Sequence, residues 1–87
     1  MSWNHRILAH KNNGDVYFQV HLVYYMDKIP ILYSPNPVTV GSDTLKGIKW
    51  TLNKMQAAVK KHVLWADEKF PNECEVLEFK EVEIIVK

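Results

Sequence analysis

The stretch from Gly14 to Asp27, GDVYFQVHLVYYMD, alternates so regularly that it constrains the fold of the whole chain. Successive side chains of a β-strand point to opposite faces, so a strand here would divide its residues into two sets. The even positions form an unbroken apolar face, namely Val16, Phe18, Val20, Leu22, Tyr24 and Met26. The odd positions are amphipathic, namely Tyr17, Gln19, His21, Val23 and Tyr25. We expect a long strand with its even face on a core.

The dipeptide Asn13-Gly14 predicts a hairpin in front of this strand, because a type I′ turn needs positive φ at both central residues. The preceding run WNHRILAH would place Trp3, His5, Ile7 and Ala9 on one side of an extended chain and Asn4, Arg6, Leu8 and His10 on the other. A two-residue loop would pair Ala9 with Phe18, whereas a four-residue loop would pair His10 with Asp15. Both loops keep the apolar sides of the two strands on one face.

A third strand is expected over IPILYS, after a turn near Asp27-Lys28. In this strand Ile29, Ile31 and Tyr33 would join the same apolar face. Pro30 cannot donate a ladder hydrogen bond, which predicts a free edge or a break in pairing at that residue. The two prolines of SPNPVTV then end the regular pairing.

An amphipathic helix is predicted next, with Ser42 or Asp43 as its N-cap and its end near Lys61 or His62. Its apolar residues recur at spacings of three and four, which predicts a stripe that faces the core. The stripe consists of Leu45, Ile48, Leu52, Met55 and Val59. Gly47 inside the helix would let it approach the sheet closely.

The tail CEVLEFKEVEIIVK is rich in Val, Ile and Phe and predicts a final strand, either one strand with a bulge or two short ones. The whole chain, 1–87, is therefore expected to form a single small α+β domain of order βββαβ. It would consist of a three-stranded antiparallel meander, one amphipathic helix on one sheet face and a C-terminal strand.

Several function classes find no support in the sequence. The lone Cys74 lies between Glu73 and Glu75, whose charges disfavour a thiolate, and no Gly-rich phosphate loop or serine elbow occurs. Among the histidines, His10 and His21 share a face but lie several residues apart along the sheet, so we expect that they cannot share an ion. We predict no enzymatic activity, no cofactor and no metal.

The location predicted for the chain is the cytoplasm, without a membrane association. No apolar run approaches the ~20 residues that cross a bilayer, and the N-terminus has no basic segment followed by an apolar one. The single cysteine agrees with a reducing compartment.

One candidate binding surface is the odd face of the long strand, because a single helix can cover only one face of the sheet. Tyrosines suit such a role, since they offer a large contact area for few rotatable bonds. The predicted partner-binding residues are Tyr17, Gln19, His21, Tyr25 and Arg6. The alternative for this face is an ordinary solvated sheet surface.

The other candidate is the helix side opposite the apolar stripe, where lysines surround a tryptophan and no acidic residue occurs between Thr44 and Ala66. Aromatic rings stack on bases and lysines contact phosphates, which would suit a nucleic acid. The residues of this alternative site are Lys46, Lys49, Trp50, Asn53 and Lys54. The competing interpretation is that lysine stems or the acidic tail simply cover Trp50.

Two resemblances accompany these patterns. The segment VTVGSDTLKGIKWTLNKMQAAV after a meander resembles the HicB-like antitoxin fold, a βββαβ domain. MSWNHRI, GDVYFQVHLVYYMD and DTLKGIKWTLNKMQAAV in succession resemble a group of short uncharacterised bacterial and prophage proteins that begin near Trp-Asn-x-Arg and continue Gly-x-Val-Tyr-Tyr. The resemblance implies a bacterial origin and the fold, but no activity. We therefore expect a non-enzymatic module that binds a protein partner or forms a homodimer, similar to an inhibitor or antitoxin, with nucleic-acid binding as the alternative.

Overall fold

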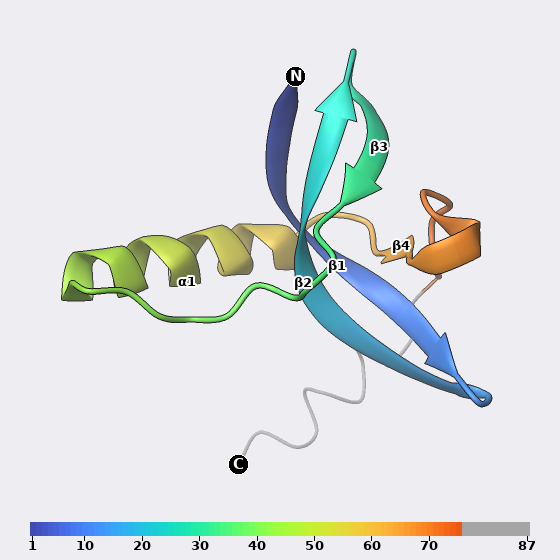
Figure 1. Ribbon diagram of the computed structural model, residues 1–87, viewed down its shortest axis with the longest axis horizontal. Helices are drawn as coiled ribbons and strands as arrows, with labels where there is room; N and C mark the ends of the chain where they lie inside the picture. Colours follow the sequence, from blue (N-terminus) through green and yellow to red (C-terminus); the bar gives the residue numbers. More distant parts are fainter. Residues whose placement is uncertain (76–87) are drawn as a thin grey trace.

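The computed structural model describes residues 1–75 and is an α+β domain with one helix beside a four-stranded sheet (Figure 1). The strands are β1 (Ser2–Asn12), β2 (Asp15–Met26), β3 (Ile29–Tyr33) and β4 (Leu64–Trp65). The helix α1 spans Leu45–Val59, and a 3-10 helix η1 spans Asp67–Lys69. The strand order is β3-β2-β1-β4, in which β4 runs parallel to β1 and the other pairs are antiparallel. The predicted α+β class and the antiparallel meander are confirmed, whereas the complete sheet is mixed.

The β1–β2 hairpin has the register that a two-residue loop requires. Asn12 pairs with Asp15 and Ala9 with Phe18, and both loop residues have positive φ, 53° at Asn13 and 88° at Gly14. Positive φ at both positions is the property of a type I′ turn. The two-residue alternative is therefore confirmed, and it places odd positions of β1 on the face of even positions of β2.

A register shift between β2 and β3 changes the face of one predicted core residue. Tyr24 pairs with Leu32 and Tyr25 with Pro30, so Ile31 is the extra residue. The break expected at Pro30 is thus confirmed. Because of the extra residue, Tyr33 lies opposite Val23, on the odd face of β2. The prediction that Tyr33 joins the face of Ile29 is wrong for this reason.

The helix begins one or two residues later than predicted and ends two or three residues earlier. Thr44 is the N-cap, and its Oγ1 accepts a hydrogen bond from the Gly47 backbone N–H at 3.0 Å. Ser42 instead accepts from the Thr44 N–H at 3.2 Å, which fixes the turn before the helix. A side chain at Gly47 would collide with Ser42, so this glycine makes room for the capping turn and not for the sheet. The helix ends at Val59, with Lys60 as its C-cap.

The side of the helix that contacts β1 overlaps the predicted stripe but is rotated from it. Its least exposed residues are Ile48, Thr51, Met55 and the buried Ala58, which recur at spacings of three and four. The predicted stripe is centred about 60° away on the helical wheel. Its members Ile48 and Met55 belong to both sets, whereas Leu45, Leu52 and Val59 are exposed. Figure 1 shows the reason: α1 extends away from the sheet, and only its C-terminal part lies beside the strands.

The main core lies on the odd face of β2, the face predicted to look outward. Leu8 and Val23 are fully buried there together with Leu64 and Ala66, and they are surrounded by Tyr25, Tyr33 and Phe70. The segment after the helix covers this face because β4 pairs with β1 at Leu8 and the Ala66 N–H donates to the Ala9 carbonyl oxygen at 2.9 Å. The even face, the predicted core, leaves large side chains partly exposed, including Phe18 and Met26.

The observed fourth strand is not the one predicted. It is Leu64–Trp65, held on its other side by the Cys74 N–H, which donates to the Val63 carbonyl oxygen at 2.7 Å, and by a bridge from Leu64 to Glu73. The predicted C-terminal strand falls almost wholly on residues 76–87, outside the described residues. Within residues 1–75, α1 is too short and too polar to cross a membrane.

Candidate functional site

Arg6 and Tyr25, two of the predicted partner-binding residues, are committed to contacts within the domain. The Arg6 guanidinium donates to the Tyr25 hydroxyl at 2.9 Å and to the His62 carbonyl oxygen at 2.6 Å. The Tyr25 hydroxyl donates in turn to Asn4 Oδ1 at 2.9 Å. Both side chains are half-buried, so the expectation that they look outward is wrong. The network ties the helix end to the sheet.

His21, the centre of the predicted surface, is a core residue with only 1% of its surface exposed. Its Nδ1–H donates to the Ser34 carbonyl oxygen at 2.9 Å, and the edge of Tyr33 packs against its ring. Burial lowers the pKa of His21, the hydrogen bond to Ser34 opposes that change, and the charge of His10 adds to it. The imidazole is therefore kept in its neutral form at pH 7.

His10 lies next to His21, contrary to the sequence-based expectation. The two Nε2 atoms are 3.1 Å apart, and the ring centroids are 5.0 Å apart. The expectation counted residues along flat strands, whereas the twist of the hairpin and the directions of the side chains bring the two rings together. Tyr17 remains partly exposed and stacks on His10 with 5.0 Å between the centroids, while the half-buried Gln19 places Oε1 at 3.4 Å from His21 Nε2.

A groove of about 350 Å³ separates the start of β1 from α1. The lining residues are Trp3, Asn4, His5, Trp50, Lys54, Ala57 and Lys61. The His5 ring lies between the two tryptophans, with centroids 6.2 Å from Trp3 and 6.0 Å from Trp50. Burial, and then the charge of Lys54, lowers the pKa of His5. An aromatic floor with ammonium groups at its edge can hold a flat or anionic group.

The groove unites only part of the predicted basic site. Trp50 and Lys54 lie together, with the ammonium 5.4 Å from the centre of the Trp50 ring, and both line the groove. The other three predicted residues are exposed on α1 outside the lining, namely Lys46, Lys49 and Asn53. Sequence reasoning missed Trp3, because strand alternation assigned it to the core. Its position at the end of β1, next to the N-terminus, was the available signal.

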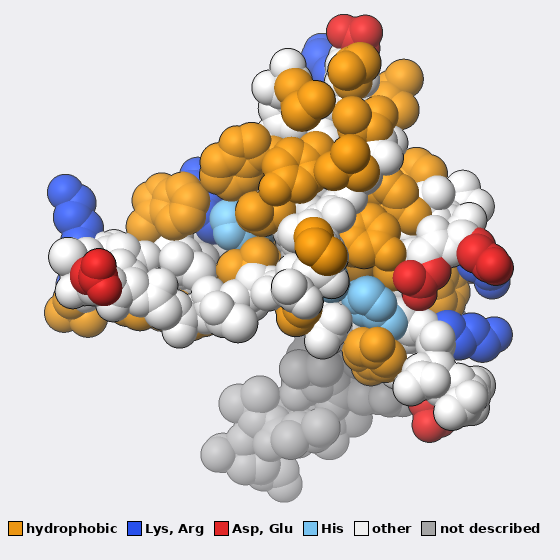
Figure 2. All heavy atoms as spheres, viewed as in Figure 1, with side chains coloured by type: hydrophobic (Ala, Val, Ile, Leu, Met, Phe, Trp, Pro, Cys, Tyr) orange, Lys and Arg blue, Asp and Glu red, His pale blue; other side chains and the backbone are white. Residues whose placement is uncertain are grey.

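Hydrophobic side chains also form a continuous exposed band beside the groove (Figure 2). In the register of the sheet, Tyr24 lies opposite Trp3 of β1 and opposite Leu32 of β3. At the turn between β2 and β3, Met26 lies opposite Ile29. All but the half-buried Tyr24 are large side chains with about half or more of their surface exposed. We call this set of five residues, with Trp50 across the groove, the apolar surface.

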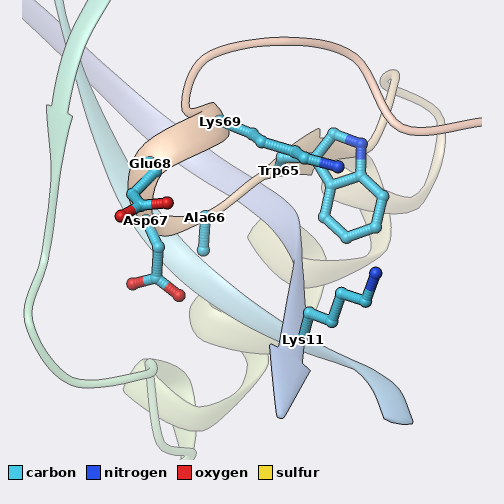
Figure 3. A pocket seen from close by; sticks show the side chains of 6 residues that line it. All are labelled: Lys11, Trp65, Ala66, Asp67, Glu68 and Lys69. Atoms are coloured by element: carbon cyan, nitrogen blue, oxygen red, sulfur yellow. The ribbon is translucent and has the colours of Figure 1, made fainter. Parts of the chain in front are cut away.

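A second hollow of about 330 Å³ lies beside β4 and η1 (Figure 3). Its lining is Lys11, Trp65, Ala66, Asp67, Glu68 and Lys69. Lys69 Nζ lies 4.9 Å from the centre of the Trp65 ring, while the carboxylates of Asp67 and Glu68 point to the other side. The sequence patterns did not identify this hollow, and its charges are of both signs.

Comparisons with known proteins give no family for this chain. Scans against protein-family models and searches of curated proteins and of solved structures found no match. Within residues 1–75, no three His, Cys, Asp or Glu side chains come together in a group that could hold a metal ion. The candidate sites therefore rest on their own geometry.

Proposed function

We propose that this chain is a small non-enzymatic module that binds a protein, either a partner or a second copy of itself, through the apolar surface. The observation that carries the proposal is the exposure of Trp3, Met26, Ile29 and Leu32 on one face. A continuous apolar patch on a small soluble domain is typical of a protein contact site. An inhibitor or antitoxin-like role is the kind of activity that such contacts would serve.

The composition of the apolar surface supports this proposal. Tryptophan, tyrosine and methionine are enriched at the centres of protein interfaces. All three residue types occur in the apolar surface, together with Ile29 and Leu32. We propose the apolar surface as the binding site in place of the predicted face around His21. Among the predicted residues of that face, Tyr17 is the most exposed. Pro30 removes one backbone donor from the edge strand β3, so contact through side chains is favoured over the addition of another strand.

The test is a double substitution, Ile29→Lys with Leu32→Lys, compared with Val40→Lys. Val40 has a similar exposed fraction, but it lies in the loop before α1. Size-exclusion chromatography with light scattering would show a dimer of the wild type, or a pull-down from bacterial lysate would return one specific protein. The double variant should lose that dimer or protein, and Val40→Lys should keep it. A monomer that captures nothing, or a double variant that behaves like the wild type, would contradict the proposal.

A nucleic acid is the second candidate ligand, favoured by the placement of Lys54 above the half-exposed Trp50 with Lys61 in the same groove. A single-stranded oligonucleotide should quench tryptophan fluorescence, and the slope of log K against log salt should be about −0.7 for each lysine engaged. Trp50→Phe should weaken binding and reduce the quenching, of which Trp3 in the same groove supplies the rest, whereas Trp65→Phe should keep both. Equal quenching in both variants, or none at low salt, would exclude this function.

A further inference from the structure

The pair His10 and His21 lies outside the apolar surface, and the proposed protein contact does not use it. Its two Nε2 atoms face each other at 3.1 Å on the buried side of the hairpin. Aromatic rings hold both imidazoles in place: Tyr17 stacks on His10, and the edge of Tyr33 packs against His21. The two nitrogens are therefore fixed in direction before any ligand arrives.

The hydrogen bonds determine which nitrogen of His21 carries a lone pair. A carbonyl oxygen can only accept, so the contact with Ser34 O at 2.9 Å puts the proton on Nδ1. His21 Nε2 then presents a lone pair toward His10. A ring N–H held by a backbone carbonyl is the outer-shell arrangement that orients metal-binding histidines in proteins.

Gln19 places a third donor atom beside His21 Nε2. Gln19 Oε1 lies 3.4 Å from His21 Nε2, and both atoms are acceptors. The cluster thus offers three lone-pair donors, and a proton on His10 can satisfy only one contact between them. A cation among the three atoms would satisfy all of them.

The spacing suits a transition metal ion. With metal–nitrogen bonds of 2.0–2.1 Å, two nitrogens 3.1 Å apart subtend an angle of about 100° at the metal, between octahedral and tetrahedral values. The half-buried His10 leaves one side of the cluster open to solvent, so water can complete the coordination. Imidazole and amide oxygen are ligands for borderline ions such as Zn²⁺, Cu²⁺ and Ni²⁺.

We propose that His10 Nε2, His21 Nε2 and Gln19 Oε1 form a binding site for one divalent transition metal ion of the zinc class. With only two imidazoles and a neutral oxygen, the site would bind an exchangeable ion and not a permanent structural one. The site lies on the face opposite the apolar surface, so metal binding and protein binding can be tested separately.

The direct test is a titration of the untagged, chelator-treated chain with Zn²⁺. Calorimetry measures the binding, and NMR of the histidine ring protons and nitrogens shows which histidines change. We expect one ion per chain and shifts at His10 and His21, with His5 and His62 unchanged. His10→Gln should weaken binding by more than the roughly 10- to 100-fold that loss of an outer-shell partner costs. Because His10 is half-buried, this variant should remain folded, which circular dichroism would check.

Two matched variants separate this site from other zinc ligands. His62 lies 3.8 Å from Glu73 on the surface and is the strongest competing pair, so His62→Gln should leave the affinity unchanged. Gln19→Glu should tighten binding, because a carboxylate replaces a neutral oxygen. The proposal is overturned if Zn²⁺ does not bind, if His10→Gln binds it as the wild type does, or if His62→Gln abolishes binding. In the first case the two histidines share only a hydrogen bond.

Discussion

The two faces of the β1–β2 hairpin differ in burial in the opposite sense to the one that their residue types predict. The even face of β2 is uniformly apolar but leaves Phe18 41% exposed, whereas the odd face is mixed and buries Val23 completely. The cause is coverage: residues 63–74 lie across the odd face, and α1 reaches only part of the even face. Burial therefore follows which segment covers a face, and amphipathic residues such as His21 and Tyr25 can be buried when neighbours satisfy their polar atoms.

The largest expected effect on stability comes from truncating one apolar side chain on each face. Leu8→Ala should lower the free energy of unfolding by about 3 kcal/mol, because Leu8 is fully buried among Val23, Leu64 and Ala66. Phe18→Ala removes a larger side chain but should cost only about 1 kcal/mol, since much of the ring already contacts water. Urea unfolding followed by circular dichroism measures both values. Equal losses would contradict the difference between the two faces, and a greater loss for Phe18→Ala would mean that the even face is the main core.

The next test removes one hydroxyl from each face. Tyr25→Phe should cost about 1 kcal/mol, because it takes away the acceptor for Arg6 and the donor to Asn4. Tyr24→Phe should cost less than about 0.5 kcal/mol, since within residues 1–75 its hydroxyl makes no hydrogen bond with the protein. The same urea titrations provide the comparison. A Tyr25→Phe protein as stable as Tyr24→Phe would mean that the network with Arg6 contributes nothing.

Local patterns predicted much of the fold because their causes are local. The turn at Asn13-Gly14 and the break at Pro30 follow from backbone conformations that depend on the residue itself. The extent of the hairpin and the existence of α1 follow from periodicity over many residues. These features need no knowledge of distant partners.

The candidate sites depended on contacts that no periodicity encodes. The segment WADEKFPNE has no alternation, yet together with the preceding Leu64 it supplies β4, η1 and the cover of the odd face. The meeting of His10 with His21 depends on the twist of the hairpin and on side-chain direction, and the position of Trp3 beside Trp50 depends on where α1 crosses β1. Of the predicted site residues, Trp50 and Lys54 are the pair that the structure brings into a groove.

The smallest expected effect concerns His5, the buried histidine of the even face. Burial and the charge of Lys54 lower its pKa below 6.5 in the folded chain, while the unfolded chain keeps the ordinary value. Between those two values the unfolded state binds more protons, so stability should fall as the pH decreases from about 6.5 through the folded pKa and level off below it. His5→Gln should reduce this loss, whereas His62→Gln, at an exposed position, should not. Urea unfolding at pH 7.5 and 5.5 with a chelator present measures the difference. If His5→Gln left the pH dependence unchanged, His5 would accept a proton as readily in the folded state as in the unfolded one. In that case burial between Trp3 and Trp50 would not lower the pKa of His5.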